Sequence, residues 1–206
     1  MVFDEIPSSD IAFTPAVKRI QSRKGSRAAY ARMEAAGSWE TTITPALAGL
    51  VSEVRSFFLA TANSDGQPYI QHRGGPAGFL KVLDDKTLAF ADFKGNKQFI
   101  SQGNLEENPK AFIFLIDYAH RRRIKIWGRA EIVEDDPIFL ASLMPADYSA
   151  KPDQVMIFKL EAWDSNCPQH IPQRFEADDV RRVLAARDAR IAELEALLEK
   201  EGIAKP

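Results

Sequence analysis

Cysteine is nearly absent from this sequence: Cys167 is the only one among 206 residues. A single cysteine cannot form a disulfide within the chain, and it is typical of a protein from a reducing compartment. Long apolar runs are missing as well, since the longest, residues 111–116, is far too short to cross a bilayer. The first ten residues carry acids and no basic segment, so no signal peptide is indicated. We therefore expect a soluble, cytoplasmic protein.

An excess of positive charge is also missing. Lys and Arg number 27 against 29 Asp and Glu, which gives a net charge of −2 and argues against a dedicated nucleic-acid binder. The dinucleotide-binding, Walker, zinc-protease and nucleophile-elbow motifs are absent, and the three histidines lie far apart in the sequence. We therefore expect no metal site. A hydrophobic fraction of 45% excludes a disordered chain, and the length suits one domain with appendages.

The middle of the chain has the pattern of a mostly antiparallel sheet. Apolar and polar residues alternate in short runs, and turn residues such as Asp65-Gly66 separate them. The expected strands are residues 56–63, 69–73, 78–83, 87–93, 110–118, 122–134 and 155–163, and helices are expected at 96–107 and 136–144. The run at 110–118 is nearly all apolar, which predicts a strand buried on both sides. A closed or nearly closed small barrel would hide so many strand edges.

Helices are expected on both flanks of this sheet. Thr14-Pro15 opens a helical stretch that is interrupted near Gly25 and continues to residue 36, and Thr44-Pro45 opens a second helix over 46–54. We expect both to pack outside the main core. Residues 177–203 form one charged helix with an apolar residue every seven positions. Arg187 interrupts this repeat, so a coiled coil remains one of two interpretations, beside a solvated helix. The expected domains are 1–54, 55–176 and 177–206.

Four segments have residue types that suit a ligand, and each also has an ordinary structural explanation. Residues 71–76 are either a ligand-facing strand end or a bulged turn. Residues 92–98 run from a strand into a helix, and they suit a phosphate or simply cap that helix. The basic run at 121–125 is either an anion clamp or a solvated face. The loop 163–174 is stiffened by two prolines and contains Cys167, either a nucleophile or, more in keeping with its neighbours, a packed thiol.

Taken together, these segments resemble the FMN-binding split barrels related to pyridoxamine 5′-phosphate oxidase. The resemblance rests on residues 57–82, 87–118 and 121–135, with 155–174 adding to it. Their order is hairpin, hairpin, a helix ending in Asn108-Pro109, a strand, and then a basic strand ending in Gly-x-Ala. The sequence looks closest to the uncharacterised flavin-nucleotide-binding branch. The implied fold is mostly β with flanking helices, a six- or seven-stranded antiparallel split β-barrel with N-terminal helices and a long C-terminal helix.

The resemblance also implies a homodimer with FMN at the interface. It implies cofactor contacts from Gln71, His72, Arg73, Gly74, Phe90, Ala91, Asp92, Asn96, Lys97, Gln98, Arg123, Trp163 and Arg174. Within this set, Asn96, Lys97 and Gln98 match the family's phosphate-holding segment, and Arg123 would reach the cofactor from the partner subunit. The side chains that hold pyridoxamine phosphate in the oxidase are not recognisable, so vitamin B6 synthesis is not expected.

The function expected from these observations is that of an FMN-dependent oxidoreductase with an unknown substrate. His170 is the candidate acid or base, because imidazole titrates near neutrality. Two alternatives remain open: a non-catalytic module that stores or senses FMN, and a split barrel that binds haem or a deazaflavin. No contact with nucleic acid or membrane is expected.

Overall fold

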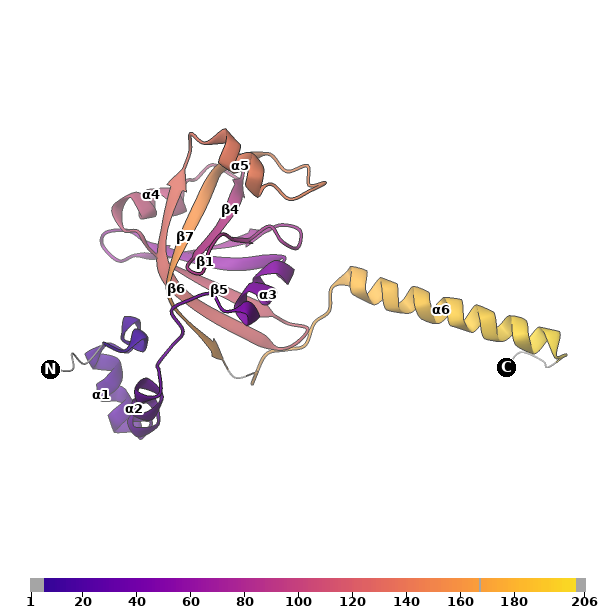
Figure 1. Ribbon diagram of the computed structural model, residues 1–206, viewed down its shortest axis with the longest axis horizontal. Coiled ribbons are helices and arrows are strands. Elements are labelled where there is room, and N and C mark those ends of the chain that lie inside the picture. The colour runs from indigo at the N-terminus through magenta and orange to yellow at the C-terminus, as the bar shows by residue number, and fades with distance from the viewer. Residues whose placement is uncertain (1–5, 167, 203–206) are drawn as a thin grey trace. The chain divides into compact units, whose positions relative to one another are not determined.

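The computed structural model describes residues 6–166 and 168–202 (Figure 1). Over these residues the chain forms one 3₁₀ helix, six α-helices and seven strands. It divides into two compact units, residues 1–117 with 123–167 and residues 118–122 with 168–206. Cys167 lies outside the described residues, so neither interpretation of this thiol is tested. No helix in the described part combines the length and the apolar character that a membrane crossing requires.

The N-terminal elements begin where the Thr-Pro pairs predict. The chain passes through η1 (Ser8–Ile11), α1 (Pro15–Lys24), α2 (Arg27–Ala35) and α3 (Pro45–Glu53). The hydroxyls of Thr14 and Thr44 accept hydrogen bonds from the Val17 and Leu47 amides, both at 3.3 Å, which caps α1 and α3. Gly25 ends α1 with a φ of 82°, a left-handed conformation that favours glycine.

All seven strands belong to one antiparallel sheet with the order β2-β1-β5-β6-β7-β4-β3. Their bounds are β1 Ser56–Ala62, β2 Pro68–Gly74, β3 Lys81–Val82, β4 Thr87–Phe93, β5 Lys110–Asp117, β6 Arg122–Val133 and β7 Pro152–Asn166. Two helices are inserted, α4 (Ile100–Glu107) and α5 (Pro137–Leu143). The predicted split-barrel class is confirmed, but residues 78–80 lie outside β3, and β7 is longer than expected at both ends.

The sheet stays open, which differs from the closed barrel that edge protection favours. Its edges are β2 and β3, and these are not joined by backbone hydrogen bonds. Side chains bridge the opening instead, because Arg73 on β2 forms an ion pair with Asp92 on β4. The sheet therefore curls far enough for polar side chains of β2 and β4 to meet, and this meeting point forms the candidate site.

The main core lies inside the curled sheet. Alternate residues of β1 and β5 point inward, among them Leu59, Ile113 and Leu115, each 0% exposed. α3 adds Leu47 and Val51 to the same core, so the expectation that this helix packs outside is wrong. Its apolar face covers the sheet, and this burial stabilises the helix as well as the sheet.

The expectation that β5 is buried on both sides is also wrong. Phe112 and Phe114 point to the outer face of the sheet and are only half-buried. Because β1 pairs Phe58 with Phe114, a third aromatic side chain shares this outer face. The apolar strand therefore presents one covered face and one partly uncovered face.

The second unit contains α6 (Ala177–Lys200) and the segment that leads into it. In this segment, the Arg174 guanidinium lies 4.9 Å from the centre of the Tyr118 ring, and the Gln173 amide donates to the Ala119 carbonyl at 2.8 Å.

Candidate functional site

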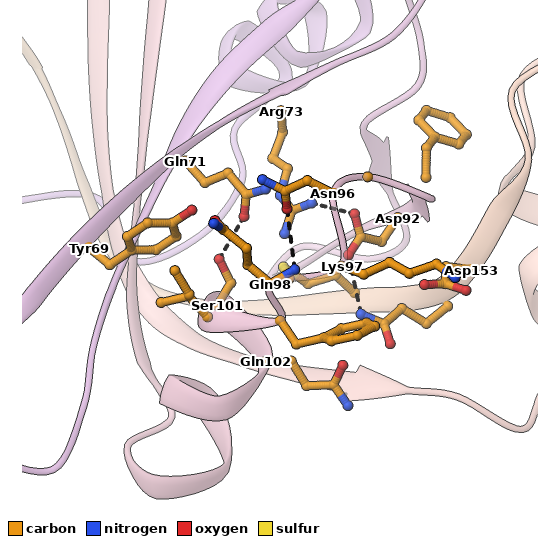
Figure 2. Close-up of a pocket in the computed structure, with 16 residues that line it drawn as sticks. Tyr69, Gln71, Arg73, Asp92, Asn96, Lys97, Gln98, Ser101, Gln102 and Asp153 are labelled. Carbon is orange, nitrogen blue, oxygen red and sulfur yellow. Dashed lines mark hydrogen bonds and ion pairs between the residues drawn. The ribbon is translucent and has the colours of Figure 1, made fainter.

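A pocket opens where the end of β2, the loop after β4, the start of α4 and the start of β7 meet (Figure 2). Its lining is mostly polar, with amide, hydroxyl, guanidinium, ammonium and carboxylate groups. The lining residues are Tyr69, Gln71, Arg73, Asp92, Phe93, Gly95, Asn96, Lys97, Gln98, Phe99, Ile100, Ser101, Gln102, Asp153, Gln154 and Met156. Six of the residues singled out from the sequence therefore lie together: Gln71, Arg73, Asp92, Asn96, Lys97 and Gln98.

The segment after β4 is a loop, not the first turn of a helix. α4 begins at Ile100, whereas the sequence pattern predicts a start at Asn96. Lys97 and Phe99 have positive φ values of 60° and 53°, which a right-handed helix does not accommodate. The Asn96 side-chain oxygen instead accepts from the Gln98 amide at 3.2 Å, forming an Asx turn. The assignment of Lys97 to the helix N-terminus is thus wrong, although Lys97 does line the pocket.

Hydrogen bonds fix one wall of the pocket. The Ser101 hydroxyl donates to the Gln71 side-chain oxygen at 2.8 Å, which ties α4 to β2. One turn later, the buried Asn104 amide donates to the Thr61 hydroxyl at 2.9 Å and ties α4 to β1. Because the Gln71 oxygen is engaged with Ser101, its NH₂ end is the one that can donate into the pocket. Figure 2 shows the Gln71, Asn96 and Gln98 side chains grouped beside Arg73.

A buried ion pair forms the floor of the pocket. Arg73 Nη1 contacts one oxygen of Asp92, and the Gln154 amide donates to the other at 3.2 Å. Burial raises the pKa of Asp92 above its ordinary value, and the charge of Arg73 opposes that rise. The Arg73 Nε atom is buried and has no hydrogen-bond partner among the described residues. This N–H group is a donor that an acceptor from outside the chain could satisfy.

Lys97 supplies positive charge that no carboxylate of the described chain neutralises. Its side chain is exposed at the pocket, and among residues 6–166 and 168–202 it forms no ion pair. The neighbouring Lys94 differs, since its ammonium lies 3.8 Å from a carboxylate oxygen of Asp153. The pocket can therefore offer one uncompensated ammonium and several amide donors to an anion.

Four residues predicted for this site lie near it in the sequence but do not line the pocket. Phe90 is buried in the core, where its ring meets Phe57 edge-to-face at 5.3 Å. Ala91 points to the opposite face of β4, into a small cluster with Val155 and Leu143 of α5. His72 is exposed on the outer face of the sheet. Gly74 follows it at the strand end, where a Cβ would lie 3.3 Å from the Arg55 carbonyl oxygen.

Arg123 and Trp163 lie on β6 and β7, outside this pocket. Trp163 belongs to the strand itself, paired with Ile126, so its assignment to a loop after the last strand is wrong. Its indole N–H donates to the Thr42 carbonyl at 2.8 Å, and its backbone forms a bridge to Glu40. Pairing with β6 extends the strand to Asn166, beyond its predicted end at residue 163. Arg123 is half-buried, and its Nε has no hydrogen-bond partner among the described residues.

Arg174 and His170 belong to the second unit. Arg174 stacks on Tyr118, and His170 is exposed with a positive φ of 62°. Their proposed roles at the cofactor stay predictions.

Several residues that line the pocket were not predicted from the sequence. Gln154 and Met156 enter from the start of β7, some sixty positions beyond Asp92, because the register pairs Gln154 with Asp92 and Met156 with Phe90. Ser101 was within the predicted helix, but nothing local indicated that its hydroxyl would face Gln71. Gln154 and Met156 could have been identified only from the pairing of β4 with β7.

Comparison with known proteins sets this pocket in a family context. Residues 43–167 match the family model described as pyridoxamine 5′-phosphate oxidase. The chain belongs to this family. The matched span includes α3, the whole sheet and every residue of the pocket, whereas α1, α2 and α6 lie outside it. A search of curated proteins found no match.

Three solved structures illustrate the likeness. HupZ of Group A Streptococcus is 21% identical, with 65% of this chain and 99% of that chain covered and a TM-score of 0.49. An FMN-binding protein from Syntrophomonas wolfei is 12% identical, with coverage of 74% and 95% and a TM-score of 0.47. A protein related to general stress protein 26, from Clostridium acetobutylicum, is 15% identical, with coverage of 64% and 92% and a TM-score of 0.43.

Proposed function

We propose that this chain binds FMN in the pocket between β2, β4 and α4 and uses it as a flavin-dependent oxidoreductase. The observation that carries the proposal is that Lys97, which forms no ion pair in the described part of the chain, lines one pocket with Gln71, Asn96 and Gln98, whose side chains carry amide groups. A cation that shares a pocket with amide donors suits a terminal phosphate dianion, and family membership makes a flavin phosphate the first candidate. The lack of a dinucleotide fingerprint favours FMN over FAD.

The rest of the pocket suits the remaining parts of such a ligand. Arg73 Nε is a buried donor without a partner in the described chain, and it lies on the strand that faces Lys97 across the pocket. Tyr69 and Phe99 add aromatic surface. Asp92 and Gln154 hold the Arg73 guanidinium in one orientation. When bound, the flavin would supply hydride and electron transfer, and these side chains would hold and orient it.

A homodimer is part of the proposal. The outer face of β1, β5 and β6 carries Phe58, Phe112, Phe114 and Trp127, all only half-buried, and Ile70 of β2 is 62% exposed. Trp39 of the same chain stacks on Trp127 at 4.6 Å and forms one border of this face. A contiguous apolar face of this kind is typical of a protein interface. Arg123 and Lys125 border it on β6. A second copy would cover the aromatic side chains, and its Arg123 would complete the anion site.

A non-catalytic role in storing or sensing FMN is the second candidate. No histidine lines the pocket in the described part of the chain: His72 lies on the outer face, and His120 and His170 belong to the second unit. Asp92 is the buried titratable carboxyl of the site, and it is engaged by Arg73 and Gln154. A pocket whose buried carboxyl is already engaged, and which no histidine of the described residues lines, suits a binding protein as well as an enzyme that relies on its cofactor.

Anaerobic reduction of the reconstituted protein tests the proposal. We expect FMN to bind with a changed visible spectrum, and we expect NADH or NADPH to bleach it and oxygen to restore it. Binding without reduction by either nucleotide would favour the storage role. Absence of FMN binding by a folded protein would overturn both.

A further inference from the structure

α6 is a long helix (Figure 1), and within the second unit it buries none of its residues. It runs for 24 residues, Ala177–Lys200, outside the segment that matches the family model. Its apolar side chains are open to solvent, with exposed fractions of 53% for Leu184, 55% for Ile191 and 43% for Leu194. In proteins, most of the stability of a helix comes from the packing of its apolar face, so this surface suits a partner.

The exposed apolar residues form one stripe along the helix. With Leu184 at an a position of a heptad, the a positions are Leu184, Ile191 and Leu198, and the d positions are Val180, Arg187 and Leu194. Acidic and basic residues occupy other faces, where Arg181 pairs with Asp178 and Arg182 with Asp179 at i,i+3 spacing. A stripe that repeats every seven residues matches the seam of a coiled coil, and its natural occupant is another such helix.

We infer that α6 pairs with α6 of a second copy of this chain as a parallel, two-stranded coiled coil. The inference rests on the proposed homodimer. Three heptads interrupted by an arginine would associate weakly on their own. Dimerised barrels would hold the two tethered helices at a high effective concentration, which favours their pairing without any new contact.

Charge complementarity selects the parallel orientation. In a parallel pair, a g residue faces the e residue five positions later on the other helix, so Arg190 faces Glu195 of the partner subunit. In the antiparallel pair that keeps the stripe in register, Asp188 and Arg190 would each lie opposite their own copies. Like charges would then meet at the centre of the pair.

Arg187 is accommodated in the parallel pair as well. A d side chain inserts between four residues of the facing helix, and one of these is the following e residue, Asp188 of the partner subunit. In this register each Arg187 also faces its own copy across the seam, and the Asp188 carboxylate of the partner subunit offsets that like charge. A polar residue at one seam position lowers stability but fixes register, since in register the two arginines share one layer, whereas a shifted pairing would bury each of them in a separate, otherwise apolar layer.

Single-cysteine crosslinking of the full chain tests this inference. In a Cys167→Ser background, the thiol of Leu184→Cys would be the only one, and in the parallel pair it would face its own copy within disulfide reach. In the antiparallel pair the two copies would be about 15 Å apart along the axis. We expect Leu184→Cys to form a crosslinked dimer under mild oxidation at least about tenfold faster than Ala189→Cys, which lies on the opposite face of the helix.

Charge reversal provides a second measurement that does not depend on one variant. In the Leu184→Cys protein, Arg190→Glu should slow crosslinking about threefold to tenfold, and Arg190→Glu with Glu195→Arg should restore it. Equal crosslinking at 184 and 189 in a protein that light scattering shows to be dimeric would overturn the coiled coil and leave the barrel dimer intact. A monomer would overturn both. Crosslinking of Leu184→Cys only to Leu194→Cys would establish the antiparallel pair and overturn the inference.

Discussion

At the scale of single residues, Lys97 provides the sharpest test of the pocket. Replacing Lys97 with Ala removes the uncompensated ammonium, and a hydrogen bond to a charged group contributes about 1.5–3 kcal/mol. We therefore expect Lys97→Ala to weaken FMN binding about 10- to 150-fold, with a smaller loss for riboflavin, which has no phosphate. Fluorescence quenching of each flavin measures both affinities. Arg123→Ala should have a similar effect if the partner subunit completes the site, and Arg123→Lys should recover only part of the loss.

Lys94→Ala is the matched control for this prediction. Lys94 carries the same charge in the same loop, but it does not line the pocket and already pairs with Asp153. Its loss should change FMN affinity much less than the loss of Lys97. If the two variants bind FMN equally well, the phosphate is not held at Lys97.

Asp92 should leave a signature in the pH dependence of stability. Burial raises its pKa in the folded state, so between its ordinary and raised values the folded protein holds a proton that the unfolded chain has released. The free energy of unfolding contributed by this group therefore falls as the pH rises through that window. Asp92→Asn lacks this contribution but keeps an oxygen for the Gln154 amide.

Urea unfolding at a series of pH values measures this contribution. We expect the stability of Asp92→Asn minus that of the unaltered chain to increase from about pH 4 upward and to level off above the raised pKa. The lowered pKa values of Asp84 and Glu107 make the free energy of unfolding rise with pH. Both proteins contain these two groups, so their contribution cancels when the two stabilities are subtracted. A difference that stays constant with pH would show that the pKa of Asp92 is not raised.

At the scale of elements, the bulge in β6 depends on Gly128. The register shifts between Trp127 and Gly128, and a Cβ at Gly128 would lie 2.1 Å from the Lys159 carbonyl oxygen and 2.7 Å from the Phe158 ring. Neither the backbone oxygen nor the buried ring can move away easily. We expect Gly128→Ala to lower the free energy of unfolding by about 1–3 kcal/mol or more.

Gly49→Ala should have the opposite sign. Gly49 lies within α3, and a Cβ there would meet nothing within 4 Å. Alanine in a helix interior is favoured over glycine by about 0.5–1 kcal/mol. Chemical denaturation of the two variants should therefore move the midpoint in opposite directions, and destabilisation by both would contradict the packing described for α3.

The elements with strong local signals could be predicted from the sequence. Thr14 and Thr44 fix two helix starts through their caps, and Asp65-Gly66 forms the turn that joins β1 to β2. The start of α4 could not be predicted, because Lys97 and Phe99 adopt positive φ values that neither residue type signals. Long-range pairing also decides the true extent of β7, since residues 164–166 belong to the strand through their pairing with β6.

The candidate site also contains residues that the sequence could predict and residues that it could not. The residues of β2 and of the loop after β4 could be recognised because they are close in sequence and polar in unusual places. Gln154 and Met156 could not, because they reach the pocket only through the register between β4 and β7. Phe90 and Ala91 were included by resemblance, and their burial shows that neighbouring strand residues point to opposite faces.

At the scale of the whole molecule, the outer aromatic face should control assembly. Replacing Phe114 with Glu would set a charge among Phe58, Phe112 and Trp127, and burying an unpaired charge in an interface is strongly unfavourable. At low micromolar concentration we expect light scattering to give a dimer for the unaltered protein and a species near 23.0 kDa for Phe114→Glu. The FMN affinity of Phe114→Glu should fall as the dimer is lost.

Ile138→Glu is the control for this surface. Ile138 is 83% exposed on α5, away from the outer aromatic face, so its replacement should leave the dimer unchanged. A Phe114→Glu protein that remains dimeric would place the subunit interface elsewhere.

The central claim is that this pocket holds one FMN per chain, and identification of the released ligand tests it most directly. The purified protein is reconstituted with an equimolar mixture of FMN, FAD and riboflavin, washed and then denatured by heat, and the released compounds are separated by chromatography and quantified against protein. The account predicts FMN as the main compound, close to one per chain and strongly reduced in Lys97→Ala. Release of FAD, of riboflavin in equal amount, or of no flavin from the folded protein would contradict it.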